Sequence, residues 1–88
     1  MTNDDPAVIR SSKSQRVLVD GFPFQIEILR LDQDADWTLE VVDPDGTSHV
    51  WDDTFKTDKS ARDEAIRALQ VGATAFMADF GDRSVSLQ

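Results

Sequence analysis

Apolar and polar residues alternate through the first half of the chain in runs that predict β-strands. One run ends at Val19 and a second extends from Phe22 to Leu31, with Asp20-Gly21 between them. An Asp-Gly pair between alternating apolar runs is typical of a two-residue type I′ hairpin. We therefore predict an antiparallel pair of strands in which Val19 faces Phe22.

Two further strands are predicted over residues 37–42 and 47–55. The turn between them, residues 43–46, reads Asp-Pro-Asp-Gly, which suits a type I turn with proline second and glycine last. Pairing Ile28 with Leu39 keeps the apolar side chains of neighbouring strands on one face. The predicted inner face of the sheet carries Val17, Val19, Phe22, Phe24, Ile26, Ile28, Trp37, Leu39, Val41 and Trp51.

The period of the pattern changes to three and four residues near Asp58, which predicts an amphipathic helix. Thr57 or Asp58 can cap its first turn through a side-chain oxygen. An unbroken helix from Asp58 to Phe80 would span about 33–35 Å, whereas seven-residue strands span only about 23 Å. We therefore expect the helix either to break at Gly72 or to overhang the sheet. The apolar stripe consists of Ala61, Ala65, Ile66, Leu69, Gly72, Ala73, Phe76 and Phe80.

These elements predict an α+β fold. We expect a four-stranded, or three-stranded, antiparallel β-meander with one C-terminal amphipathic helix packed on one face. The length of 88 residues suits a single domain, which we place at residues 15–80. Residues 1–14 are polar and lack periodicity, so we expect a disordered N-terminal tail, and we expect a frayed C-terminal tail at residues 81–88.

The net charge of −8 is concentrated in one segment. Residues 32–53 contain eight carboxylates and no lysine or arginine. Such a block repels phosphate, so we do not expect nucleic acid as the main partner. We interpret the block as a solubilising face, and a variant of this hypothesis treats it as a mimic of nucleic acid that meets a basic protein.

The composition also bears on compartment. The chain has no cysteine, which excludes disulfide bonds and thiolate metal sites. The absence of cysteine also fits a reducing compartment. No apolar run approaches the ~20 residues of a membrane helix, and the polar N-terminus does not resemble a signal peptide. We expect a cytoplasmic protein without a membrane partner.

Few residues suggest chemistry. Asp32, Asp34 and Asp36 match the first three ligand positions of a calcium-binding loop. Trp37, however, occupies the sixth position, where that loop needs glycine for its sharp turn. His49, which the predicted register sets opposite Val41, has no second histidine or cysteine near it in sequence. Because metal sites and catalytic triads need such partners, we expect no catalytic residue, no cofactor and no metal site, and we do not expect an enzyme. Weak cation binding remains an alternative.

Some side chains could contact a partner. Arg62 falls within the apolar stripe, and we expect it to meet the sheet edge near Asp53 or Trp51 as a snorkelling or paired arginine. The predicted outer face of the sheet carries more leucine and valine than a wetted face requires. The expected partner contacts are Arg62, Lys59, Leu29, Leu31, Phe76, Met77 and Phe80.

Residues 37–69 carry three pieces in order, namely Trp37-Thr-Leu-Glu-Val-Val, His49-Val-Trp and Thr57-Asp-Lys-Ser-Ala-Arg. This segment resembles the hairpin-and-helix half of double-stranded-RNA-binding domains. It is also similar to small antitoxins of the HicB type, which share strands followed by a helix. The resemblance implies a helix packed on a hairpin. The basic cluster is reduced to Lys59 and Arg62, and Asp58 replaces a lysine, so no function is carried over.

The sequence thus predicts a small acidic protein that acts as a non-catalytic protein-interaction or regulatory module. The partner is either an unknown protein or a second copy in a homodimer. Nucleic-acid binding through the helix start, with Lys56, Lys59, Arg62 and Arg67, is the first alternative, and a weak metal-binding protein is the second.

Overall fold

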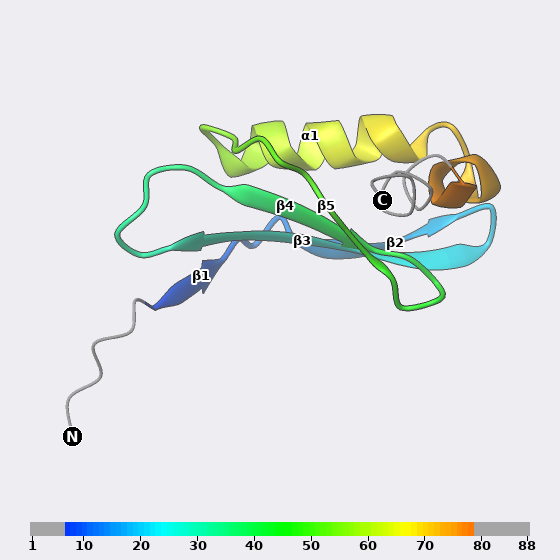
Figure 1. The fold of residues 1–88 in the computed structure, drawn as a ribbon, viewed down its shortest axis with the longest axis horizontal. Helices are drawn as coiled ribbons and strands as arrows, with labels where there is room; N and C mark the ends of the chain where they lie inside the picture. Colours follow the sequence, from blue (N-terminus) through cyan, green and yellow to red (C-terminus); the bar gives the residue numbers. More distant parts are fainter. Residues whose placement is uncertain (1–6, 79–88) are drawn as a thin grey trace, which may run out of the picture.

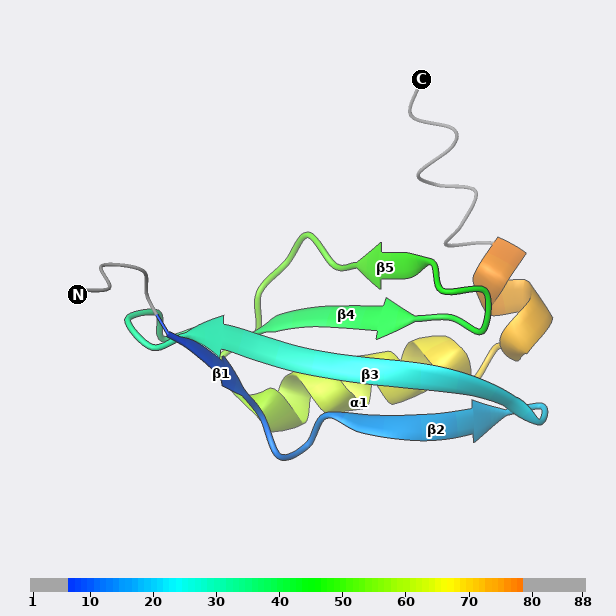
Figure 2. The same cartoon turned by 90° about the horizontal axis from the view of Figure 1, so that it is seen from below.

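Strand β3 (Phe22–Leu31) is the longest strand, and the other strands assemble on its two edges (Figures 1 and 2). The computed structural model describes residues 7–78. On one edge β3 pairs with β4 (Thr38–Val42), which pairs with β5 (Ser48–Val50). On the other edge it pairs with both β1 (Val8–Arg10) and β2 (Gln15–Val19). All pairings are antiparallel.

The registers of the central hairpins agree with those that the sequence predicts. Val19 pairs with Phe22 across the Asp20-Gly21 turn, and both turn residues have positive φ, 54° and 83°, as a type I′ turn requires. Ile28 pairs with Leu39. Val41 pairs with His49 in the next hairpin. Turn chemistry and the period of two therefore fixed the side-chain faces of the sheet.

The sheet has five strands, where the sequence predicted four or three. The additional strand, β1, lies in residues 1–14, which we expected to be disordered; that expectation is wrong for residues 8–10, while residues 1–6 lie outside the described residues. Val8 pairs with Leu31 and Arg10 with Leu29. Apolar periodicity could not find this strand, because it is three residues long and its neighbours are polar.

Two serines join β1 to β2 and replace part of the sheet ladder. The Ile28 N–H donates to Ser14 Oγ at 2.9 Å, and the Ser14 hydroxyl lies 3.3 Å from the Ile28 carbonyl oxygen. The Ser11 N–H donates to the same carbonyl at 2.9 Å. Ser11 Oγ also donates to Asp58 Oδ2 at 2.7 Å, which ties this corner to the start of the helix. A serine-rich segment that suggested disorder is thus a buried corner of the sheet.

The C-terminal helical region is divided, as one of the two alternatives anticipated. Helix α1 (Asp58–Leu69) is capped by Thr57, whose Oγ1 accepts the Ser60 N–H at 3.0 Å. Gly72 has a φ of 99°, which interrupts the helix, and a second short helix occupies residues 73–78. The Ala73 N–H at its start donates to Asp20 Oδ2 at 2.9 Å, so the β2–β3 turn holds the second helix in place.

Helix α1 packs against β3 and β4 and covers one face of the sheet (Figure 1). The two largest fully buried side chains, Phe24 and Phe76, meet edge to face with ring centroids 5.7 Å apart. Trp37 and Trp51 border this core and are partly buried. The core consists of Phe24, Ile26, Ile28, Leu39, Val41, Ala61, Ala65, Ala68, Leu69, Ala73 and Phe76.

Replacing Ser14 with alanine should destabilise the fold. The substitution leaves the buried Ile28 N–H without its acceptor, and an unsatisfied buried donor costs about 1–3 kcal/mol. Urea unfolding followed by tryptophan fluorescence measures the loss. Ser12→Ala is the matched control, because Ser12 is exposed and such changes usually stay within about 0.5 kcal/mol. Equal stability of the two variants would contradict the role assigned to Ser14.

Candidate functional site

Strand β2 offers an open edge of the sheet. A two-residue hairpin closes on a hydrogen-bonded pair, so Val19 and Val17 direct their backbone groups toward β3. The N–H and C=O groups of Arg16 and Leu18 therefore point away from the sheet, and no hydrogen bond within residues 7–78 occupies them. Figure 2 shows β2 along the margin of the sheet. An unpaired edge of this kind can accept another strand.

Beside this edge lies an apolar hollow. Helix α1 packs over β3 and β4 and leaves the inner side of β2 only partly covered. The hollow has a volume of about 190 Å³ and opens to solvent. Its lining combines β2 and the end of α1, with Val17, Leu18, Val19, Ile66, Leu69 and Gln70. We call this hollow, together with the β2 edge, the β2–α1 groove.

The β2–α1 groove is oriented, because the strand and the helix run in the same direction. At one end Ser11 binds Asp58 at the start of α1, and at the other end Asp20 binds Ala73 just after it. Within residues 15–19 the strand spans about 17 Å. The groove therefore has a first end near Lys13 and a second, apolar end near Val19.

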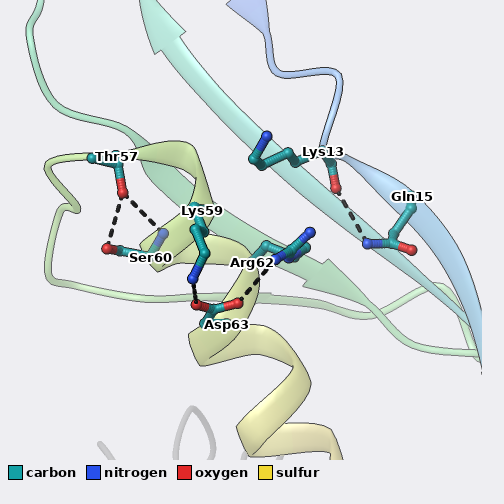
Figure 3. A network of polar contacts seen from close by, with 7 residues as sticks. All are labelled: Lys13, Gln15, Thr57, Lys59, Ser60, Arg62 and Asp63. Atoms are coloured by element: carbon teal, nitrogen blue, oxygen red, sulfur yellow. Dashed lines mark hydrogen bonds and ion pairs between the residues drawn. The ribbon is translucent and has the colours of Figure 1, made fainter.

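Basic and acidic side chains lie together at the first end of the groove, and Figure 3 shows Lys13, Lys59, Arg62 and Asp63 there. The hydrogen bond from Ser11 lowers the pKa of the Asp58 carboxyl, and the positive charge of Lys13 acts in the same direction. No salt bridge of Lys13 is found in the described part of the chain. Lys59 Nζ pairs with Asp63 Oδ2 at 2.8 Å, and Arg62 Nη2 with Asp63 Oδ1 at 3.3 Å. The hydrogen bond from Lys59 lowers the pKa of the Asp63 carboxyl, and Arg62 acts in the same direction.

The residues expected to contact a partner lie in different places. Arg62 Nη2 pairs with Asp63 Oδ1 at 3.3 Å, and Trp51 Nε1 donates to Glu64 Oε2 at 3.1 Å. The expected contact of Arg62 with the sheet edge stays a prediction. Lys59 is exposed at the helix start.

The apolar members of that set divide between the open face and the core. Leu29 and Leu31 are half-buried on the face of the sheet opposite the helix. Phe76 is 0 % exposed, so it belongs to the core and is not available to a partner. Met77 packs against that core, and Phe80 lies outside the described residues.

The sheet face opposite α1 has no covering layer among the described residues (Figure 1). Val8, Leu18 and Val50 are each more than half exposed, at 64 %, 68 % and 64 %. Arg10 and Glu27 form an ion pair on this face at 2.8 Å. The face therefore mixes exposed apolar side chains with paired charges, a composition that suits contact with another protein surface.

His49 has a buried partner that the sequence did not reveal. His49 Nε2 and Asp43 Oδ2 are 2.8 Å apart, and their side chains are 5 % and 4 % exposed. Asp43 Oδ1 accepts the N–H groups of Asp45 and Thr47 at 2.9 and 3.0 Å. The His49 ring also meets the Phe76 ring, with centroids 4.9 Å apart. The His49–Asp43 pair thus stabilises the β4–β5 turn, and the contact of His49 with Phe76 packs the second helix against this turn.

The acidity of Asp43 follows from these bonds. Burial raises the pKa of its carboxyl, but the hydrogen bonds with His49, Thr47 and Asp45 together outweigh burial and lower it. The signal in the sequence was the spacing Asp43, Thr47, His49 around a tight turn. An aspartate at the first turn position often binds backbone N–H groups two residues on, but that rule does not indicate a buried histidine.

The Asp32–Asp36 loop is organised by an arginine. Arg30 Nη1 donates to the carbonyl oxygens of Leu31 and Asp34 at 3.2 and 2.9 Å, and its guanidinium carbon lies 5.1 Å from the centroid of the Trp37 ring. Over residues 7–78 no group of three or more histidine or carboxylate side chains is placed to hold a metal ion.

Comparisons with protein-family models, with curated proteins and with solved structures gave no match. The resemblance of residues 37–69 to double-stranded-RNA-binding domains and HicB-type antitoxins therefore stays a prediction. Within the described part of the chain, no helix has both the length and the apolar character to cross a membrane.

Replacing Asp43 with asparagine should flatten the pH dependence of stability in acid. Because the pKa of Asp43 is lowered in the folded state, the unfolded chain takes up the proton first. The ionised Asp43 carboxylate therefore contributes its full stabilisation above the ordinary aspartate pKa of about 3.9. This contribution is lost as pH falls through the lower pKa that Asp43 has in the folded state. Urea unfolding from pH 7 down to 3 measures the slope.

The exposed Asp45 provides the control for this experiment. Asp45→Asn should keep the steeper acid slope of the wild-type chain, because the hydrogen bond at this position comes from its backbone N–H. The assignment to Asp43 is contradicted if Asp43→Asn and the wild type lose stability in parallel.

Proposed function

We propose that the chain is a non-catalytic protein-interaction module that binds through the surfaces its sheet leaves uncovered. One observation supports this most directly: the helical layer lies on one face, while Val8, Leu18 and Val50 stand exposed on the other. Contiguous apolar patches mark protein-binding surfaces, and the half-buried Leu29 and Leu31 add apolar area to the same face. The open β2 edge adds backbone donors and acceptors beside them.

The charge distribution favours a protein over a nucleic acid as the partner. Phosphate binding depends on lysine and arginine side chains that are free to replace counterions. Lys59 and Arg62 at the helix start share Asp63, and Arg67 pairs with Glu64 at 2.6 Å. The eight carboxylates of residues 32–53 add repulsion. Nucleic-acid binding through the helix start is therefore the weaker proposal.

The proposal predicts selective capture of a protein partner. The full-length chain is immobilised, and proteins bound from a lysate of its source are quantified by mass spectrometry. The single variants Val8→Asp, Leu18→Asp and Val50→Asp scan the uncovered face. At least one should reduce capture of the same protein about tenfold, which corresponds to ~1.4 kcal/mol. Val71→Asp, on an exposed residue between the helices, should not.

Two further measurements contradict the proposal or replace it. The interaction-module proposal is contradicted if sedimentation shows a monomer at high concentration and all four variants capture proteins equally. A gel shift with duplex RNA or DNA that is lost in the double variant with Lys59 and Arg62 changed to glutamate would replace it with the nucleic-acid alternative.

A further inference from the structure

We infer that two copies of the chain pair through their β2 edges, antiparallel about a two-fold axis at Leu18, and so form one continuous sheet. This inference rests on the proposed function and names a second copy as the partner at one of the uncovered surfaces. Three features carry it, namely the outward backbone groups of β2, the position of the apolar hollow along that strand and the distribution of charge over the sheet.

The backbone of β2 suits a two-fold axis at Leu18. Leu18 directs its N–H and C=O groups away from β3, so the two copies of Leu18 can exchange both hydrogen bonds as an antiparallel pair. A two-fold contact uses the same strand on each side, and every contact in it occurs twice. The register sets Val17 of each copy opposite Val19 of the other, so that apolar side chains meet on the inner side of the sheet.

The apolar hollow is centred on the same residue. Val17, Leu18 and Val19 line it from the strand, and Ile66 and Leu69 line it from the helix. Because the strand part of this lining is symmetric about Leu18, the two-fold axis brings the hollows of the two copies side by side. The side chains of Leu18 and Ile66 are 68 % and 36 % exposed. Pairing would therefore remove apolar surface from water, which favours association.

Neighbouring registers lose this match. An axis at Val17 would set Gln15 of each copy opposite Val19 of the other, which places a polar amide against an apolar side chain. An axis at Arg16 would set two guanidinium groups directly opposite each other, and like charges at such positions are destabilising. The side chains of β2 therefore select Leu18 as the centre.

The same register joins opposite charges at both ends of the paired strands. It sets Arg16 of each copy opposite Asp20 of the other. Arg16 forms no ion pair within residues 7–78. Asp20 is exposed and binds the Ala73 N–H through Oδ2 alone, which leaves Oδ1 for a cation. Opposite charges that face each other across two antiparallel strands stabilise their pairing.

The distribution of charge also favours the β2 edge over the β5 edge. Residues 8–19 contain three basic residues and no carboxylate, although the whole chain has a net charge of −8. The carboxylates of residues 40–53 belong to β4, β5 and the segments next to them, at the opposite edge of the sheet (Figure 2). Pairing through β2 keeps the acidic edges of two copies apart, whereas pairing through β5 would bring them together.

The test begins with sedimentation of the full-length chain over a range of concentrations, which should show a reversible monomer–dimer equilibrium. Leu18→Pro removes an outward N–H and leaves the β2–β3 ladder intact, because the Leu18–Pro23 pair exchanges no hydrogen bonds. Val50→Pro makes the same change on β5, where the Glu40–Val50 pair is equivalent. The dissociation constant of the dimer should rise at least about tenfold in the first variant and stay unchanged in the second.

A charge variant keeps the inference testable if Leu18→Pro does not fold. Arg16→Glu preserves the backbone and sets like charges opposite each other twice, so the dimer should weaken about tenfold. Lys56→Glu is the matched control, because it makes the same change of charge at an exposed residue before α1. Equal weakening by the two variants would show only the effect of net charge and would overturn the inference.

Introduced thiols test the register, since the chain has no cysteine of its own. Val17 and Val19 of opposite copies would form a non-hydrogen-bonded pair with Cα atoms about 4.5 Å apart, within the range of a disulfide. On oxidation, isotope-labelled Val17→Cys chains mixed with unlabelled Val19→Cys chains should give a linked heterodimer, which mass spectrometry identifies. Self-linked Val17→Cys chains in place of the heterodimer would indicate an axis at Val17 and overturn the inference.

The remaining outcomes separate this inference from the proposed function. A chain that stays monomeric at high concentration, but captures another protein in a manner that depends on Val8 or Val50, overturns the inference alone. Capture that Leu18→Pro abolishes in a monomeric chain would place another protein at the edge, and this too overturns the inference alone. A monomer whose capture no variant changes contradicts both.

Discussion

The helical layer is narrower than the sheet that it must cover, and this mismatch shapes the whole molecule. Helix α1 has 12 residues and lies over β3 and β4. Together with Phe76 of the second helix, it seals Phe24, Ile26 and Ile28 from water. Burial of that apolar face is the main source of stability available to so small a chain. The margins of a five-stranded sheet stay open as a result. The surfaces proposed for binding are therefore a direct product of how the core is closed.

Where the chain leaves regular structure, polar side chains take over the bonding of the backbone. At the β1–β2 corner, Ser14 Oγ accepts the Ile28 N–H, which would otherwise bond to a neighbouring strand. In the β4–β5 turn, Asp43 accepts two backbone N–H groups. Asp20 does the same at the start of the second helix. No buried side-chain nitrogen or oxygen in the described residues lacks a hydrogen bond. These contacts are costly to leave unmade, so they specify one arrangement of the elements.

Most of the sheet could be derived from the sequence because its determinants are local. The Asp20-Gly21 turn and the period of two set the registers of β2, β3, β4 and β5 without any knowledge of distant contacts. The features that the sequence did not predict depend on residues that are far apart in sequence. Ser11 and Asp58 are 47 residues apart, and the burial of His49 follows from Phe76. The groove was missed for the same reason, since it combines β2 with the last turn of α1.

The contact between Phe24 and Phe76 joins the β2–β3 hairpin to the second helix, residues 73–78. During synthesis the hairpins emerge first, with local contacts that form quickly. Their apolar face stays open to water until helix α1 and the second helix have been made. Nascent chains of this protein therefore expose the apolar face of an uncovered sheet. Premature termination near Gly72 would leave that face exposed and so favour aggregation.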